Sequence, residues 1–278
     1  MIKYSTLFVL LLISLKSWGQ QITLYDSFLG TFDFTMIGNT LNVAENGTGS
    51  PCTILTQSSA DLNLEPDQEI EAAYLYWAGS GSLAQADLNV RLNGVDITAE
   101  RTFTTTIGSG NLPVYGAFSD VTPLVKATGN GTYLLSDLDL TSIIFPYCFQ
   151  NGGGGTNFGG WSIVIVYKDE SLTNNLVNIY DGFARVDTNN TSITINLTNL
   201  NVLHLVGNRI GFLAWEGDSA IANGESLLIN GQIVSNPPLN PANNAFNSTN
   251  SFTNPPRSDL WNMDLDYYDI NDYTSIGD

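Results

Sequence analysis

The sequence is poor in positive charge. It contains 9 Lys and Arg residues against 27 Asp and Glu residues, for a net charge of −18. Such a field repels the phosphates of nucleic acids and of anionic lipids, so we expect no nucleic-acid partner. Charged residues make up only 13% of the chain, which leaves a surface rich in Asn, Thr, Ser and Gly. That composition suits an exported β protein.

Histidine is almost absent as well. His204 is the only one, which excludes zinc chemistry that depends on two or three histidines. No Gly-x-Ser-x-Gly element accompanies it, so a Ser-His-Asp triad has no support. We interpret His204 as a structural or surface residue.

Cysteine is limited to Cys52 and Cys148. An even number in an exported chain favours one disulfide. Closing a loop of this length would stabilise the fold by about 4–5 kcal/mol in the chain-entropy model. The alternative is a pair of buried free thiols. A metal site on two cysteines without histidine has little support.

The N-terminus has the pattern of a signal peptide. Lys3 precedes an apolar core at 7–13, and the small residues Ser17 and Gly19 suit cleavage after Gly19. The apolar core is too short to span a bilayer comfortably. We therefore assign residues 1–19 to the signal peptide and expect the mature chain to be secreted or on the cell surface, without direct membrane insertion.

Helical periodicity is missing, and short β-rich runs separated by turn residues fill the chain. This pattern predicts an all-β fold of two β-sandwich, jelly-roll-like halves, 20–150 and 151–278, with few short helical turns. One such turn is expected at 121–127. The predicted strands are 22–29, 41–43, 69–79, 88–92, 95–105, 132–138, 161–167, 177–186, 192–197, 209–215, 226–229 and 232–234.

Two stretches resemble copies of one β unit. Each has an aromatic strand ending in Trp77 or Trp215, a glycine break, and then Asn93-Gly94 or Asn230-Gly231. Asn-Gly is a strong signal for a type I′ hairpin, because both central residues need positive φ. The repeat predicts a duplicated architecture. The run 161–167 is continuously apolar and β-branched, so it predicts a central strand buried on both faces.

Three acids stand beside glycines near strand ends. Glu216 and Asp218 flank Gly217, and Asp181 precedes Gly182. Such acids commonly stabilise turns. They are also our tentative calcium ligands, since calcium takes oxygen ligands from carboxylates and loop carbonyls. A glycosidase pair of carboxylates is the third alternative. We assign no catalytic residues and no other cofactor.

The C-terminal stretch 259–278 is the densest in aspartate. Its interleaved apolar residues predict an amphipathic strand or turn with a solvated acidic side. A calcium loop is the sharper alternative. Trp261 and Tyr267 are candidates for a ligand platform, because aromatic rings pack on sugar rings.

Six segments carry a family resemblance: 72–79 (AAYLYWAG), 120–125 (DVTPLV), 159–167 (GGWSIVIVY), 180–183 (YDGF), 216–218 (EGD) and 247–249 (NST). Together they resemble the N-terminal region of large adhesin-like, gliding-associated surface proteins of Bacteroidetes, which are exported by type IX secretion. The resemblance implies a role at the cell surface and contact with the secretion machinery. It implies no catalysed reaction. Members of that family often end in a sorting domain; none follows here, so we expect a longer protein.

These observations favour a β-rich module of a larger exoprotein, acting in adhesion or surface structure without catalysis. The first alternative is a carbohydrate-binding module, with or without calcium. The second is a secreted glycoside hydrolase that uses paired carboxylates.

Overall fold

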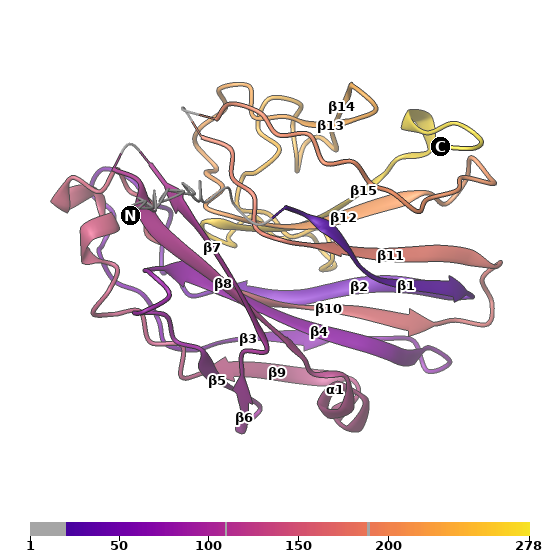
Figure 1. The fold of residues 1–278 in the computed structure, drawn as a ribbon, viewed down its shortest axis with the longest axis horizontal. Helices are drawn as coiled ribbons and strands as arrows, with labels where there is room; N and C mark the ends of the chain where they lie inside the picture. The colour runs from indigo at the N-terminus through magenta and orange to yellow at the C-terminus, as the bar shows by residue number, and fades with distance from the viewer. Residues whose placement is uncertain (1–20, 109, 188–189) are drawn as a thin grey trace, which may run out of the picture.

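The computed structural model describes residues 21–108, 110–187 and 190–278, so the predicted signal peptide lies outside the described residues. The described chain is an all-β, sandwich-like fold with a single α-helix, as the sequence predicts. Its centre is a five-stranded antiparallel sheet in the order β2-β10-β4-β8-β7 (Figure 1). The strands of this sheet are β2 (Phe32–Thr40), β10 (Gly159–Lys168), β4 (Glu69–Ser80), β8 (Leu112–Asp120) and β7 (Arg101–Ile107).

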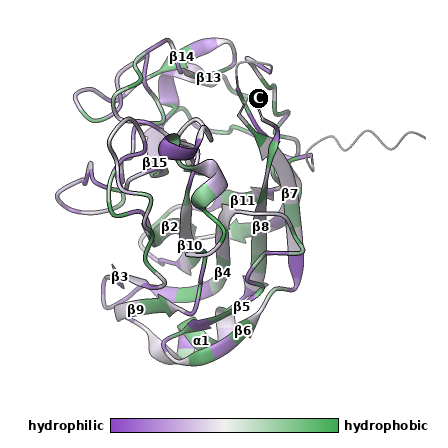
Figure 2. Ribbon diagram, turned by 90° about the vertical axis from the view of Figure 1, so that its left-hand side faces the viewer, coloured by the Kyte–Doolittle hydropathy of each residue, from purple (hydrophilic) through white to green (hydrophobic). Residues whose placement is uncertain are grey.

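A four-stranded sheet and the helix α1 (Thr122–Thr128) cover one face of the central sheet. Trp77 and Trp161 are fully buried between these layers. Figure 2 shows hydrophobic residues along β9 and α1. The helix confirms the turn expected at 121–127. The covering sheet consists of β3 (Ser58–Leu62), β9 (Gly131–Ser136), β5 (Asn89–Leu92) and β6 (Val95–Thr98).

Three two-stranded sheets complete the strand structure on the described residues. Phe118 and Val166 point to the face of the central sheet opposite the four-stranded sheet. They belong to a second core there, which includes Leu265 of β15. The central sheet is therefore buried on both faces, and the prediction for 161–167 is confirmed: Trp161 to Val166 are all buried. The pairs are β1 (Thr23–Gly30) with β11 (Asn175–Asp181), β12 (Arg209–Trp215) with β15 (Met263–Asp269), and β13 (Leu227–Ile229) with β14 (Gln232–Val234).

Both Asn-Gly hairpins are confirmed. Asn93 and Gly94 have φ of 50° and 78°, and Asn230 and Gly231 have φ of 49° and 80°. They join β5 to β6 and β13 to β14, as expected for type I′ turns. The duplication into halves at residue 150 stays a prediction. In the structure β10 pairs with both β2 and β4, so one sheet contains strands from both sides of that residue.

Three expectations about single segments are wrong. The predicted strand at 41–43 forms none, since Asn42 makes only an isolated bridge with Ile54. The predicted strand at 192–197 forms no described strand, and its residues are exposed. The acidic side of the C-terminal strand is not solvated, because Asp264 and Asp266 in β15 are fully buried. The outer loops at 240–251 cover these two carboxylates and supply hydrogen-bond donors to them.

Candidate functional site

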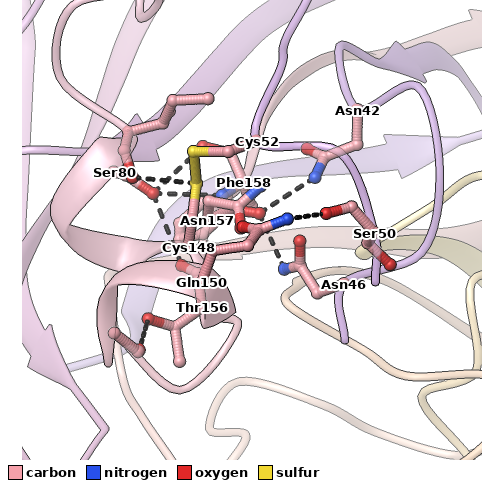
Figure 3. The surroundings of a disulfide bond; sticks show 12 residues. Asn42, Asn46, Ser50, Cys52, Ser80, Cys148, Gln150, Thr156, Asn157 and Phe158 are labelled. Atoms are coloured by element: carbon pink, nitrogen blue, oxygen red, sulfur yellow. Dashed lines mark hydrogen bonds between the residues drawn. A yellow bond between two sulfur atoms is a disulfide. The ribbon is translucent and has the colours of Figure 1, made fainter. Parts of the chain in front are cut away.

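The predicted disulfide between Cys52 and Cys148 is present, with Cα atoms 5.7 Å apart. It joins the loop after β2 to the long connection before β10. Asn157 strengthens the same junction, because its carbonyl accepts hydrogen bonds from the side-chain amides of Asn42 (2.9 Å) and Asn46 (2.7 Å) (Figure 3). We call these two loops, residues 41–57 and 137–158, the disulfide end. Loops held this firmly on a sheet scaffold can present side chains in one arrangement.

Two phenylalanine rings flank Cys148 at the disulfide end. Phe145 begins the 3₁₀ turn η1 (Phe145–Tyr147) and Phe149 begins η2 (Phe149–Asn151). Their exposed fractions are 60% and 47%, whereas Tyr147 and Cys148 between them are buried. The buried side chains of Tyr147 and Cys148 thus hold the backbone in place, while the rings of Phe145 and Phe149 face outward. Such anchored, exposed rings are suited to contact with another molecule.

A cluster of four partly buried carboxylates lies beside the disulfide end. We call Glu45, Glu216, Asp218 and Glu225 the acidic cluster. Glu45 comes from the disulfide end and accepts hydrogen bonds from the backbone N–H and hydroxyl of Ser219, at 2.9 and 3.0 Å. The loop after β2 is thereby tied to the turn after β12.

The turn after β12 has a conformation that L-residues rarely adopt. Glu216 has φ of 66°, in the left-handed region. Its backbone N–H donates to the Asn262 carbonyl at 2.7 Å, and the Ser248 hydroxyl donates to the Gly217 carbonyl at 3.0 Å. These contacts to two other segments over-determine the turn, which explains how the strained conformation persists.

Burial and mutual repulsion perturb the acidic cluster. Burial, then a hydrogen bond with Glu45 and the negative charges of Glu45 and Glu225, raise the pKa of Asp218 to about 7. Burial followed by the charges of Asp218, Glu225 and Glu45 raises the pKa of Glu216 well above its ordinary value. Burial also raises the pKa of Glu225. On the described residues, no Lys or Arg forms an ion pair with any of the four.

The structure brings together two of the three predicted calcium ligands. Glu216 and Asp218 belong to the acidic cluster, but Asp181 has different partners. Its carboxylate accepts two hydrogen bonds from the Arg101 guanidinium, at 2.7 and 2.9 Å, and one from the Tyr76 hydroxyl at 3.1 Å. Across residues 21–108, 110–187 and 190–278, no group of three or more His, Cys, Asp or Glu side chains is arranged to hold a metal ion.

Trp261 lies just before β15, whereas Tyr267 lies in the second half of that strand. Trp261 precedes β15, and its carbonyl accepts a hydrogen bond from the Thr40 hydroxyl. Tyr267 is the fifth residue of β15, about 13 Å beyond Met263 at the usual strand rise. Its ring packs on Phe252 with centroids 5.1 Å apart. The aromatic platform stays a prediction, and both side chains are partly buried.

Sequence reasoning missed Glu45, Phe145 and Phe149 as members of one region. Nothing in the chain near Glu45 links it to residue 218, because the contact depends on how two distant loops pack. Cys52 and Cys148 offered the only signal, since a disulfide between them places the loops around both cysteines together.

Two shallow depressions of about 380 and 490 Å³ lie away from the acidic cluster, beside Ile70 and beside Arg101.

Comparisons with known proteins identify no relative. No family model matches the chain, and no match is found among curated proteins or solved structures. No helix within the described ranges is long and apolar enough to cross a membrane.

Proposed function

We propose that the chain is a module of an exported, surface-associated protein and that it acts in adhesion through the disulfide end. The partner is a protein surface that carries both apolar and basic groups. The module has no catalytic role. The observation that supports this function best is the pair of exposed rings, Phe145 and Phe149, on a backbone anchored by the disulfide.

Charge supports the choice of partner. The chain has a net charge of −18, and one member of the acidic cluster, Glu45, lies in the disulfide end with the two rings. A basic surface would be attracted over a long range, and the rings would then bury apolar area at contact. A disulfide is compatible with an extracellular compartment. The resemblance of 72–79 and 159–167 to adhesin-like, gliding-associated proteins of the type IX pathway points to the same role.

The arrangement of the carboxylates disfavours the hydrolase alternative. Among the carboxylates considered for hydrolysis, Asp181 is engaged by two hydrogen bonds from the Arg101 guanidinium and one from the Tyr76 hydroxyl. Its oxygens are therefore not free to act on a substrate together with Glu216 or Asp218. We therefore propose a binding role for this end of the molecule rather than hydrolysis.

The functional test is gene deletion with complementation. Loss of the protein should reduce attachment and spreading of the cells, and the wild-type gene should restore both. A gene encoding Phe145→Ala together with Phe149→Ala should fail to restore them. A gene encoding Leu29→Ala is the matched control, since Leu29 is 79% exposed on β1. Attachment that is unaltered by deletion would contradict the proposal, and a glycan array bound by the purified chain would favour the carbohydrate alternative.

A further inference from the structure

The acidic cluster brings two carboxyl groups to one turn. Glu45 accepts a hydrogen bond from the backbone N–H of Ser219 at 2.9 Å, so its carboxylate lies at the turn that carries Asp218. Two carboxylates at one turn repel each other, and a cation between them removes that repulsion. Glu216 and Glu225 add negative charge nearby, and no described Lys or Arg neutralises it. A cation would therefore gain from all four groups.

One member of the pair is held in place independently of any ion. Glu45 accepts hydrogen bonds from the Ser219 backbone N–H and hydroxyl, and shares the Ser248 hydroxyl proton, at 3.2 Å, with the Gly217 carbonyl. Its carboxylate is thus oriented by two different segments before a ligand arrives. Pre-orientation of this kind lowers the cost of assembling a site.

A neutral oxygen without a partner lies at the same turn. Asn244 is only 3% exposed, and its Nδ2 donates to the carbonyls of Ser219 (3.1 Å) and Asp218 (3.4 Å). Those two acceptors fix which end of the amide is nitrogen. The Oδ1 atom is buried and has no hydrogen-bond partner. A buried acceptor oxygen without a donor is costly unless something positive binds it.

The position of Asn244 places this oxygen among the acids. Its backbone forms a bridge with Glu225, and the next residue, Ala245, donates its N–H to the Glu225 carbonyl at 3.0 Å. Its side chain reaches the backbone of Asp218. The amide that carries the unpartnered oxygen therefore lies at the turn of Asp218 and Ser219, the turn to which Glu45 also binds.

We propose that Glu45, Asp218 and the Oδ1 of Asn244 bind a divalent cation of the calcium type. Glu216 and Glu225 contribute charge, and water completes the shell, which calcium tolerates because its coordination is irregular and rich in neutral oxygens. Only two carboxylates bind the ion directly.

The site joins three segments that are distant in sequence. Glu45 lies in the loop after β2, Asp218 follows β12, and Asn244 lies between β14 and β15. A bound ion would fasten the disulfide end to the outer loops. The inference does not depend on the adhesive function, because the ligands are defined by their own contacts.

The test is calcium titration of the EDTA-treated mature chain by calorimetry, with terbium luminescence excited through tryptophan as a second readout. Trp215 directly precedes Glu216, so a terbium ion at this site should be sensitised. We expect one calcium ion per chain with a dissociation constant of about 10⁻⁴–10⁻³ M, the range of extracellular modules. Asp218→Asn and Glu45→Gln should each weaken binding at least about tenfold, as should Asn244→Ala.

Matched controls separate this site from diffuse attraction to an acidic protein. Asp96→Asn and Glu170→Gln remove the same charge from exposed positions and should leave the affinity unchanged. Asp181→Asn should also leave it unchanged. An absence of calcium binding to the wild-type chain at millimolar concentration would overturn the proposal. So would equal weakening by the exposed and the cluster variants. The wild-type measurements remain decisive if a variant fails to fold.

Discussion

Asp264 lies directly against Gly217, so a Cβ atom on Gly217 would overlap the carboxylate oxygen Oδ2 of Asp264. Asp264 is fully buried, and its other oxygen accepts the backbone N–H groups of Asn247 (2.8 Å) and Thr249 (3.0 Å). One buried carboxylate thus joins the outer loop to β15 and leaves no room beside the turn after β12. The acidic cluster depends on this packing for its geometry.

Gly217→Ala should destabilise the fold by about 1–3 kcal/mol, the usual cost of overpacking a buried site. The added methyl would meet Oδ2 of Asp264 and also the Phe246 carbonyl at 2.8 Å. Urea unfolding measures the change. Gly110→Ala is the control, because an added Cβ there meets only Leu112 at 3.6 Å or more. Equal stability of the two variants would show that the turn can move away from Asp264.

Removal of the disulfide by Cys52→Ala with Cys148→Ala should cost about 3–5 kcal/mol, since the two cysteines lie 96 residues apart. Urea unfolding with and without a reducing agent measures the loss. Reduction should lower the midpoint of the wild-type chain and leave that of the double variant unaltered. An unchanged wild-type midpoint would contradict the assigned contribution of the crosslink.

Arg101→Met should destabilise the chain by about 1–3 kcal/mol, because the buried carboxylate of Asp181 would lose a two-pronged partner. The side chains of Arg101 and Asp181 are 38% and 5% exposed. Arg101→Lys should restore only part of the loss, since an ammonium group lacks the planar fork that donates to both carboxylate oxygens in parallel. Thermal unfolding of the three proteins tests this order, and full rescue by lysine would refute the two-pronged contact.

The acidic cluster should make the metal-free chain less stable as the pH rises. The pKa of Asp218 is about 7 in the folded chain against 3.8 ordinarily, so the folded state binds more protons than the unfolded state between these values. The stabilisation that the Asp218 carboxyl contributes is fully present below about pH 4. It is lost as the pH rises through 7. Glu216 and Glu225 act in the same direction.

Asp218→Asn should therefore flatten the fall in unfolding free energy between pH 4 and 7, measured in EDTA. Asp139→Asn should retain that fall, because hydrogen bonds from Thr141 lower the pKa of Asp139 in the wild-type chain. Identical pH profiles for the wild-type chain and Asp218→Asn would contradict the perturbed carboxyl pair.

Local chemistry made much of the fold predictable. The Asn93-Gly94 and Asn230-Gly231 turns need positive φ, which Asn and Gly tolerate, so the two hairpins follow from four residues. The apolar run at 161–167 could only be a strand with both faces covered. The segment 192–197 has the same alternation as a strand, yet it forms none, because strand formation also needs a partner edge that the local sequence does not specify.

The candidate site was less predictable because its contacts join distant segments. The sequence suggests that the carboxylates of Asp264 and Asp266 are exposed to solvent. They are buried instead, and hydrogen-bond donors from residues 240–251 offset the cost of burying them. Glu216 and Asp218 were found because they flank a glycine at a strand end. Glu45 lies more than 170 residues away from Asp218 and carries no local signal, so only the packing of the loops reveals it.

Binding by the disulfide end is tested most directly by comparing the purified mature chain with two variants on immobilised protein surfaces and on whole cells. The wild-type chain and Leu29→Ala should bind alike, and higher salt should weaken both. Phe145→Ala with Phe149→Ala should lower the affinity by tenfold or more, about 1.4 kcal/mol, without a change in thermal stability. Equal binding by all three proteins would contradict the account.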